Sequence, residues 1–165
     1  MASILPIPAE IFKYFAYDPE TGIMRWKINN GRGNPKGKLI GHKNKKGYIE
    51  ARFKGKNYLC HRIAWAIGHN TLDVPAILDH INGNPSDNRL CNLRAATNQQ
   101  NNFNRKSRRN GLKGVSFKKS RNKWESQIKI NEKSKYLGLF DTEIEAHEAY
   151  CKAARELYGE FFNPG

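Results

Sequence analysis

Asp79 and His80 are adjacent in the sequence and are followed by Asn82-Gly83, a dipeptide typical of a tight turn. A histidine with an ordinary pKa near 6.5 can take a proton from water at neutral pH, so His80 could act as a general base in phosphodiester hydrolysis. A carboxylate such as Asp79 is a hard ligand that suits Mg²⁺ or Mn²⁺. Taken alone, the pair favours a structural interpretation, in which Asp79 ends a strand and His80 is half buried.

The residues around this pair predict a small strand–loop–strand–helix unit. The segment from Leu78 to Pro85 is expected to be a strand that ends in the Asn82-Gly83 turn. Leu90–Ala96 is expected to be the returning strand, and Thr97 to cap a short helix that begins at Asn98. Such a unit is too small to bury a core of its own. We therefore expect it to pack on a preceding helix, which the apolar spacing of residues 61–70 predicts.

A second set of elements is predicted towards the C-terminus. Strands are expected at Gly114–Phe117, Trp124–Ile130 and Lys135–Leu139, followed by a helix with a Thr142–Glu145 capping box and an apolar stripe that ends at Leu157. Strand alternation divides the middle strand into two faces. Its helix-facing side is expected to carry Trp124, Ser126, Ile128 and Ile130, and its other side Glu125, Gln127 and Lys129.

Positive charge is concentrated in two stretches of the chain. The net charge is +14, and residues 25–62 and 103–135 together hold 24 of the 29 Lys and Arg residues but only 3 of the 15 acids. Surfaces that serve only solubility usually mix both signs, so this separation favours a polyanionic partner. Neither a basic amphipathic helix nor a long apolar run is present, which argues against a membrane. We therefore expect a soluble, cytoplasmic protein.

The three cysteines, and the histidines other than His80, show no metal-binding pattern. The three cysteines are widely spaced, which indicates neither a disulfide framework nor a zinc knuckle, and we expect all of them to be free and buried: Cys60, Cys91 and Cys151. His61 is expected to pack beneath the predicted unit. No role is assigned to His42, His69 and His147.

The segment from Val74 to Asn101 resembles the HNH homing endonucleases of phages and group I introns. The resemblance is carried by a dense, ordered series: His61-Arg62, Asp79-His80-Ile81-Asn82-Gly83-Asn84, Asp87-Asn88-Arg89, Asn92-Leu93-Arg94, Thr97 and Asn101. It implies a ββα-metal (His-Me) nuclease finger without structural zinc. It also implies that His80 is the general base and that Asn92 keeps the His-bearing loop in shape.

The same resemblance implies a single divalent cation, Mg²⁺ or Mn²⁺, held by Asp79 and Asn101. No zinc is expected, because the amide oxygen of Asn101 is a hard ligand. Asn98 and Asn102 flank Asn101 and are alternatives for the second ligand, although spacing from Thr97 favours Asn101. The loop residues Asn82, Asn84 and Asn88 are expected to form turns rather than bind the metal.

Residues 111–164 resemble the AP2/ERF DNA-binding domain. The matching residues are Gly114-Val115, Trp124, Ile128, Leu137 to Thr142, Ala146, Ala149-Tyr150, Ala153-Ala154, Gly159-Glu160-Phe161 and Asn163. The resemblance implies a three-stranded sheet in the major groove with one helix packed behind it. Several arginines of the family are Lys or Ser here, which predicts phosphate anchoring with modest base selectivity. DNA contacts are expected from Arg62 in the first module and from Lys113, Ser116, Lys118, Arg121, Gln127, Lys129, Lys135 and Tyr136.

Together these features predict an α+β protein with four parts: a β-rich, DNA-contacting region at 1–58, an HNH nuclease at 59–104, a basic linker at 105–110 and an AP2-like domain at 111–165. We expect a metal-dependent endonuclease of the homing type that cleaves double-stranded DNA in a bacterial host cell and is encoded by a phage or mobile intron. A monomer is the favoured oligomeric state.

Two alternatives remain at this point. The first is an AP2-type DNA-binding regulator with a decayed nuclease core, which the presence of Asp79, His80, Asn92 and Asn101 argues against. The second is an RNA-binding protein, which is supported only by the positive charge.

Overall fold

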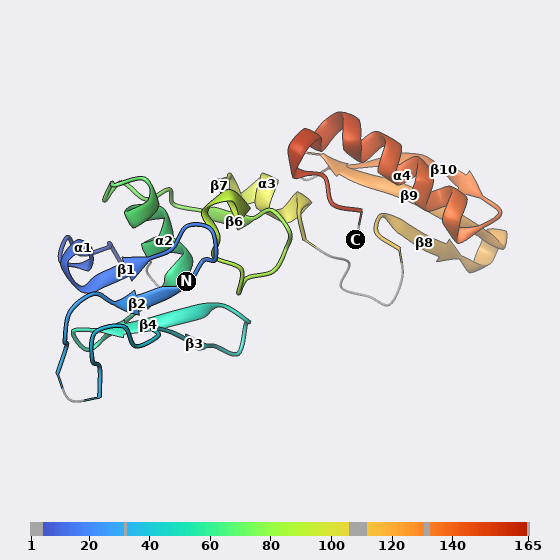
Figure 1. Cartoon of the computed structure of the whole chain (residues 1–165). Helices are drawn as coiled ribbons and strands as arrows, with labels where there is room; N and C mark the ends of the chain where they lie inside the picture. Colours follow the sequence, from blue (N-terminus) through green and yellow to red (C-terminus); the bar gives the residue numbers. More distant parts are fainter. Residues whose placement is uncertain (1–4, 32, 106–111, 131–132, 165) are drawn as a thin grey trace. The chain divides into compact units, whose positions relative to one another are not determined.

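The chain folds into two compact units that both contain α-helices and β-strands (Figure 1). The computed structural model describes residues 5–31, 33–105, 112–130 and 133–164. Contacts divide the chain into a first unit, Met1–Ala96, and a second unit, Thr97–Gly165. The mixed composition agrees with the α+β class expected from the sequence. Apart from Arg105, the predicted basic linker lies outside the described residues.

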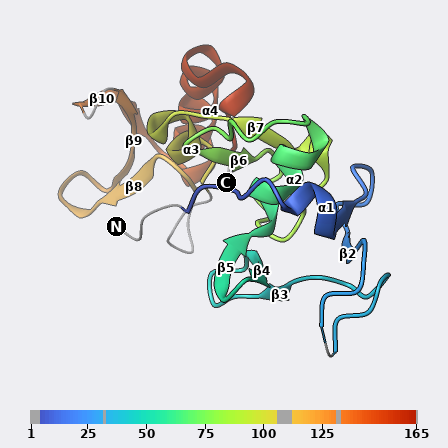
Figure 2. The same ribbon diagram turned by 90° about the vertical axis from the view of Figure 1, so that its left-hand side faces the viewer.

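The first unit is built around aromatic side chains and one buried helix. In chain order its elements are α1 (Ile11–Tyr14), β1 (Phe15–Tyr17), β2 (Met24–Trp26), β3 (His42–Lys43), β4 (Ile49–Phe53), β5 (Lys56–Leu59), α2 (Cys60–Gly68), β6 (Leu78–His80), η1 (Leu90–Asn92) and β7 (Leu93–Ala95). Helix α2 runs directly on from β5 (Figure 2) and contacts β1, β4 and β5. Its side chains Ile63 and Ala64 are fully buried. Residues 61–70 thus supply the supporting helix that their spacing predicts.

Strands β4 and β5 form a hairpin with a tight turn. The register pairs Phe53 with Lys56, so the turn has only two residues, Lys54 and Gly55. Both have positive φ angles, 48° and 78°, as a type I′ turn requires. Phe53 then points into the core, where its ring lies 5.3 Å from that of Phe15 in an edge-on arrangement.

Strands β6 and β7 pair antiparallel, with His80 opposite Leu93. The loop between them is held by turns from the N-terminal region. Tyr17 donates its hydroxyl to the carbonyl of Asn88 at 2.7 Å, and the amide of Leu90 donates to Pro19 at 3.0 Å. Ser86 Oγ donates to the carbonyl of Gly47 at 2.7 Å. The N-terminal region is therefore part of the framework that shapes this loop.

The second unit contains an antiparallel three-stranded sheet in the order β10-β9-β8. Its elements are α3 (Asn98–Phe103), β8 (Val115–Lys118), η2 (Lys119–Arg121), β9 (Lys123–Ile130), β10 (Lys133–Phe140), α4 (Glu143–Tyr158) and η3 (Gly159–Phe161). Helix α4 contacts all three strands (Figure 1). Thr97 and Thr142 both form the capping boxes that start their helices, as expected.

The helix α4 lies close to the sheet because its inner positions include small residues. Ala146 and Ala154 are fully buried, and Tyr150 lies between them. The expectation that Leu157 belongs to this stripe is wrong, since its side chain is 46% exposed and Tyr158 is buried instead. The buried positions Ala146, Tyr150, Ala154 and Tyr158 are four residues apart, so the buried stripe of α4 continues to Tyr158.

The three cysteines are free, but only two of them are buried, Cys60 and Cys151. Cys91 is exposed, contrary to the expectation from its apolar character. It lies in η1, whose short turn buries the neighbouring Asn92 and leaves Cys91 on the outer side. Within the described ranges, no helix is long and apolar enough to cross a membrane.

Gly22 should tolerate substitution poorly, because it lies against the backbone of the loop between β6 and β7. It has a φ of +73°, and a Cβ at this position would lie 2.6 Å from the amide nitrogen of Arg89. Backbone atoms cannot move aside as a flexible side chain can. The Gly22→Ala substitution should therefore lower the free energy of unfolding by about 3 kcal/mol or more, as measured by urea unfolding.

Gly31 is the matched control for this experiment. Its φ is +74°, but an added Cβ would meet nothing within 4 Å. Gly31→Ala should therefore cost only the backbone strain, about 1–2 kcal/mol. Equal losses in the two variants would contradict the close approach of the loop to Gly22.

Candidate active site and nucleic-acid interface

His80 lies at the end of β6 and is buried, with 5% of its surface exposed. Its ring is 5.1 Å from that of His61 in an edge-on arrangement and 5.9 Å from that of Tyr48. Burial lowers the pKa of His80 below its ordinary value, while the contact with Asn88 and the charge of Asp79 act in the opposite direction. The environment thus favours a neutral imidazole at neutral pH.

Asn88 contributes to this site in a way that the sequence did not predict. Its side chain is buried, and its Oδ1 lies 3.3 Å from Nε2 of His80. Asn88 was expected to form a turn rather than bind the metal, and its contact with His80 is a further role that this expectation did not include. The signal in the sequence that could have indicated this role was the position of Asn88 within the Asp87-Asn88-Arg89 segment of the motif. The partner atom became visible only once the loop had folded back onto β6.

The side-chain amide of Asn92 ties together the two ends of the loop that follows His80. Its Oδ1 accepts from the backbone amide of Asn82 at 3.0 Å. Its Nδ2 donates to Asn82 Oδ1 at 3.1 Å and to the carbonyl of Asp87 at 2.8 Å. Asn92 is itself buried. Its amide therefore makes three bonds within the loop, a pattern suited to fixing the loop's conformation.

Asp79 is buried beside a positive charge. Arg94 faces it across the β6–β7 ladder and donates from Nε at 2.9 Å and from Nη2 at 2.8 Å to the same oxygen, Oδ2. Both side chains are largely enclosed, at 5% and 12% exposure. A buried carboxylate needs such a partner, because desolvation strongly penalises an isolated charge. Arg94 belongs to the motif, but the sequence did not reveal this pairing.

Asn101 lies on α3, which groups with the second unit. The two alternative residues, Asn98 and Asn102, are four positions apart and so share one face of this helix. Both line a hollow of the second unit, whereas Asn101 does not.

The donor chemistry of these residues fits a hard divalent cation. The carboxylate of Asp79 and the amide of Asn101 offer oxygen donors, which are the ligands that Mg²⁺ and Mn²⁺ prefer. Among the described residues, no group of three or more His, Cys, Asp or Glu side chains could hold a metal ion. A cation at Asp79 would therefore depend on this carboxylate and on oxygen donors such as amides.

On the sheet of the second unit, several predicted DNA contacts gather on one face. Lys118, Arg121 and Tyr136 line one hollow of about 390 Å³ together with Glu125. Lys118 also forms an ion pair with Glu125 at 3.1 Å. Tyr136 is 58% exposed and is paired with Gln127 on β9. The structure therefore brings together a basic, partly aromatic surface on this side of the sheet.

The two faces of β9 follow the predicted alternation. Ser126 and Ile128 are buried, whereas Gln127 and Lys129 are exposed. The pairing of strands nevertheless corrects one predicted contact: Lys135 lies opposite Ile128. Directly opposite residues in an antiparallel pair share a face, so Lys135 belongs to the side that carries Ile128. Ser116, paired with Glu125, lies on the predicted DNA side.

Two other expected DNA contacts have structural roles instead. The Arg62 guanidinium is buried on α2 and donates to the carbonyls of Pro75 at 2.7 Å and Val74 at 3.4 Å. Lys113 Nζ donates to the carbonyls of Phe103 at 2.6 Å and Asn163 at 3.0 Å. Burial lowers the pKa of Lys113. Local sequence could not reveal these partners, because all but Phe103 lie more than ten residues away.

Comparison with known proteins identifies two families in this chain. Residues 58–103 match the HNH endonuclease family, and residues 110–160 match the AP2 domain. This chain belongs to the HNH endonucleases and carries an AP2-like domain. HNH and AP2 domains both bind DNA, and the HNH domain indicates nuclease activity. The two matches cover both segments in which sequence motifs were found.

Two relatives of this HNH endonuclease come from a phage and a virus. It is 32% identical to Protein 3.8 of Escherichia phage T7 over 104 residues, which are 61% of this chain and 85% of that protein. It is 36% identical to an uncharacterized HNH endonuclease of Acanthamoeba polyphaga mimivirus over 120 residues, which are 73% of this chain. The alignment spans 63% of the mimivirus protein. No solved structure matches this chain.

His61 should make the stability of the first unit depend on pH. Burial, followed by the neighbouring His80 and Arg62, lowers the pKa of His61 to about 3. In the unfolded chain its pKa is about 6.5. Between these values the unfolded chain binds a proton that the folded chain does not. The free energy of unfolding should therefore fall as pH drops below about 6.5, by up to about 1.4 kcal/mol per pH unit from this group.

The measurement is urea unfolding, followed by circular dichroism, at several pH values between 4.5 and 7.5. The His61→Gln variant should show a shallower pH dependence than the wild type. The control is His69→Gln, since His69 is exposed on the surface. If His61→Gln and the wild type lose stability at the same rate with pH, then His61 is protonated in the folded state.

Proposed function

We propose that this chain is a divalent-metal-dependent endonuclease that hydrolyses phosphodiester bonds in double-stranded DNA. The observation that carries the proposal is a buried His80, with its pKa lowered by burial, placed next to the carboxylate of Asp79 and against the amide of Asn88. Neutral histidine beside a hard oxygen ligand suits the activation of water near a bound cation. The family match and the fixed loop around His80 support the same conclusion.

His80 is the proposed general base. When Asn88 Oδ1 accepts a hydrogen bond from Nε2–H, the lone pair of the neutral ring lies on Nδ1. His80 takes a proton from a water molecule, whose oxygen attacks phosphorus while the bond from phosphorus to the leaving 3′ oxygen breaks. Asn92 keeps the loop in the conformation that places Asn88 against the ring. Each of these side chains thus has a separate role in preparing the base.

Asp79 and Asn101 are the proposed ligands of one Mg²⁺ or Mn²⁺ ion. When bound, this ion supplies positive charge that stabilises the transition state and the leaving oxygen. Arg94 orients Asp79 through Oδ2 and contributes to its charge balance. No zinc is proposed at this site, because carboxylate and amide oxygens are hard donors.

The exposed face of the sheet in the second unit is the proposed DNA-binding surface. We propose contacts from Ser116, Lys118, Arg121, Gln127, Lys129 and Tyr136, and we no longer assign DNA contacts to Arg62, Lys113 and Lys135. Two lysines and one arginine supply its positive charge, so phosphate contacts should contribute more than base recognition. We further propose a homing role and a mobile-element origin, for which the phage and virus relatives are the support.

Replacing the general base should remove cleavage while sparing DNA binding. The His80→Ala substitution should slow nicking of supercoiled plasmid by at least about 100-fold in the presence of Mg²⁺ or Mn²⁺. Its affinity for duplex DNA should stay within a few-fold of the wild type. His69→Ala is the matched control, because His69 is an exposed histidine of the same unit. Wild-type chain that leaves plasmid intact in both metals would support the regulator alternative.

Removing a proposed metal ligand should have a different effect from removing its neighbours. Asp79→Ala and Asn101→Ala should each abolish Mg²⁺-dependent nicking, because a hard cation with so few protein ligands tolerates little loss. EDTA should do the same to the wild type. Asn102→Ala, at the adjacent position of the same helix, should cleave at close to the wild-type rate. If Asn101→Ala is fully active and Asn102→Ala is not, the ligand assignment moves to Asn102.

A further inference from the structure

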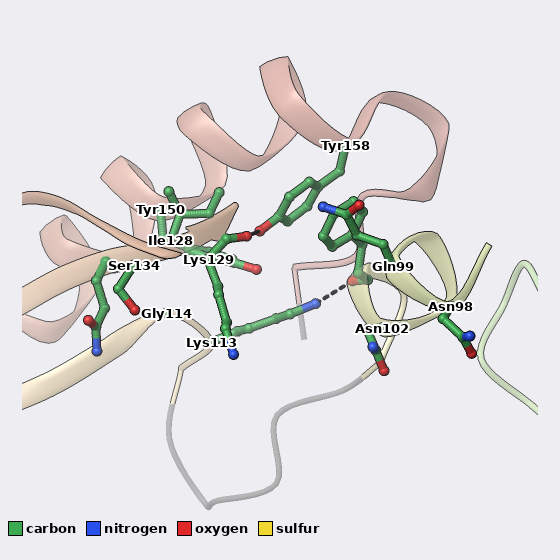
Figure 3. Close-up of a pocket in the computed structure, with 12 residues that line it drawn as sticks. Asn98, Gln99, Asn102, Lys113, Gly114, Ile128, Lys129, Ser134, Tyr150 and Tyr158 are labelled. Carbon is green, nitrogen blue, oxygen red and sulfur yellow. Dashed lines mark hydrogen bonds between the residues drawn. The ribbon is translucent and has the colours of Figure 1, made fainter. Parts of the chain in front are cut away.

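The short helix α3 is fastened at its C-terminal end to the AP2-like part of the second unit. The ring of Phe103, the last residue of α3, stacks on Tyr158 with ring centroids 3.6 Å apart and an angle of 11°. Tyr158 is the last residue of α4 and belongs to the buried cluster of this unit, against which Phe103 packs. Figure 3 shows Tyr158 reaching from α4 towards the helix that carries Gln99 and Asn102.

Polar contacts reinforce this stacking. Lys113 Nζ, in addition to its bond with Asn163, donates to the carbonyl of Phe103, where a cation is favourable at a helix C-terminus (Figure 3). Asn163 Nδ2 donates to Asn104 at its carbonyl, 3.0 Å, and at its Oδ1, 3.1 Å. Asn104 is 4% exposed. We call these five residues the α3 anchor: Phe103, Asn104, Lys113, Tyr158 and Asn163.

Helix α3 needs such support, because it is too short to be stable alone. It has six residues, none of them buried, and isolated helices shorter than about 12 residues are marginal in water. Its capping box fixes only the first turn. Its side chains Asn98, Gln99 and Asn102 line a hollow of about 620 Å³ and so do not pack tightly on the sheet (Figure 3). The α3 anchor therefore carries much of the helix's tertiary support.

We propose that Tyr158 and Asn163 are positioning residues for the metal ligand Asn101. This inference rests on the proposed function, in which Asn101 helps to hold the cation. Through the α3 anchor, the AP2-like domain keeps α3 ordered and so lowers the metal concentration that cleavage requires. The domain then has a second role besides binding DNA, because part of the nuclease site depends on its core.

The test compares four full-length variants in two measurements. Tyr158→Ala removes the stacking partner, whereas Tyr158→Phe keeps the ring and loses only the hydroxyl that bonds to the Lys129 carbonyl. Leu157→Ala, at an exposed neighbouring position, is the matched control. Asn163→Ala removes the bonds to Asn104 without touching α4. The measurements are plasmid nicking over a range of MnCl₂ concentrations and amide hydrogen exchange without metal.

Tyr158→Ala should raise the MnCl₂ concentration for half-maximal nicking by about tenfold or more, as expected for loss of support behind a metal ligand. In Tyr158→Phe and Leu157→Ala, this MnCl₂ concentration should stay within about twofold of the wild-type value. In Asn163→Ala, it should lie between the values of these two variants and that of Tyr158→Ala. In Tyr158→Ala, exchange should accelerate at the Asn101 and Asn104 amides, which bond to Thr97 and Gln100, but not in β9. As an additional control, the affinity of Tyr158→Ala for duplex DNA without metal should equal that of the wild type.

The outcomes separate this inference from the proposed function. Unchanged metal requirement and unchanged α3 exchange in Tyr158→Ala would overturn the inference while leaving the nuclease assignment intact. Wild-type chain that does not cleave with either metal would overturn the proposed function and, with it, the positioning role. If Tyr158→Ala also loses protection in β9, Asn163→Ala decides, and a wild-type metal requirement in that variant would overturn the inference.

Discussion

The side-chain amide of Asn92 is the contact on which the geometry around His80 depends. It bonds at once to Asn82, just after His80, and to Asp87, just before Asn88, so the loop closes on itself. This closure brings Asn88 against the imidazole. A loop of polar residues has little apolar surface to bury, and its conformation must come from such bonds. An amide suits the task because it offers donors and an acceptor on one rigid group.

The rest of the first unit supports this loop from outside. The hydroxyl of Tyr17, the carbonyl of Pro19 and the backbone at Gly47 each bond to it, and all three belong to the N-terminal region. The aromatic core around Phe15 and Phe53 stabilises this N-terminal region. The β-rich N-terminal region was expected to contact DNA. Its observed contribution is to give the small, polar loop around His80 a rigid framework.

The second unit contains both the AP2-like domain and the last helix of the HNH match. Its sheet presents Lys118, Arg121 and Tyr136 around one hollow, while the opposite side packs on α4. The end of that same helix stacks on Phe103, which closes the HNH match, although Tyr158 lies within the AP2 match. Packing against the larger core stabilises a helix that is too short to be stable alone. Evolutionary modules and physical units therefore have different boundaries in this chain.

The sequence by itself determined the local features of this protein. Strand alternation on β9, the capping boxes at Thr97 and Thr142, and the turn after Phe53 all follow from short-range rules, and the structure has them. The motif residues also placed Asp79 and His80 together at a strand end. Only the tertiary structure decided the partners of buried polar groups: Arg94 for Asp79, Asn88 for His80, and distant carbonyls for Arg62 and Lys113. A buried charge or amide must find a partner wherever the fold brings one, and that choice depends on contacts between residues that are distant in the chain.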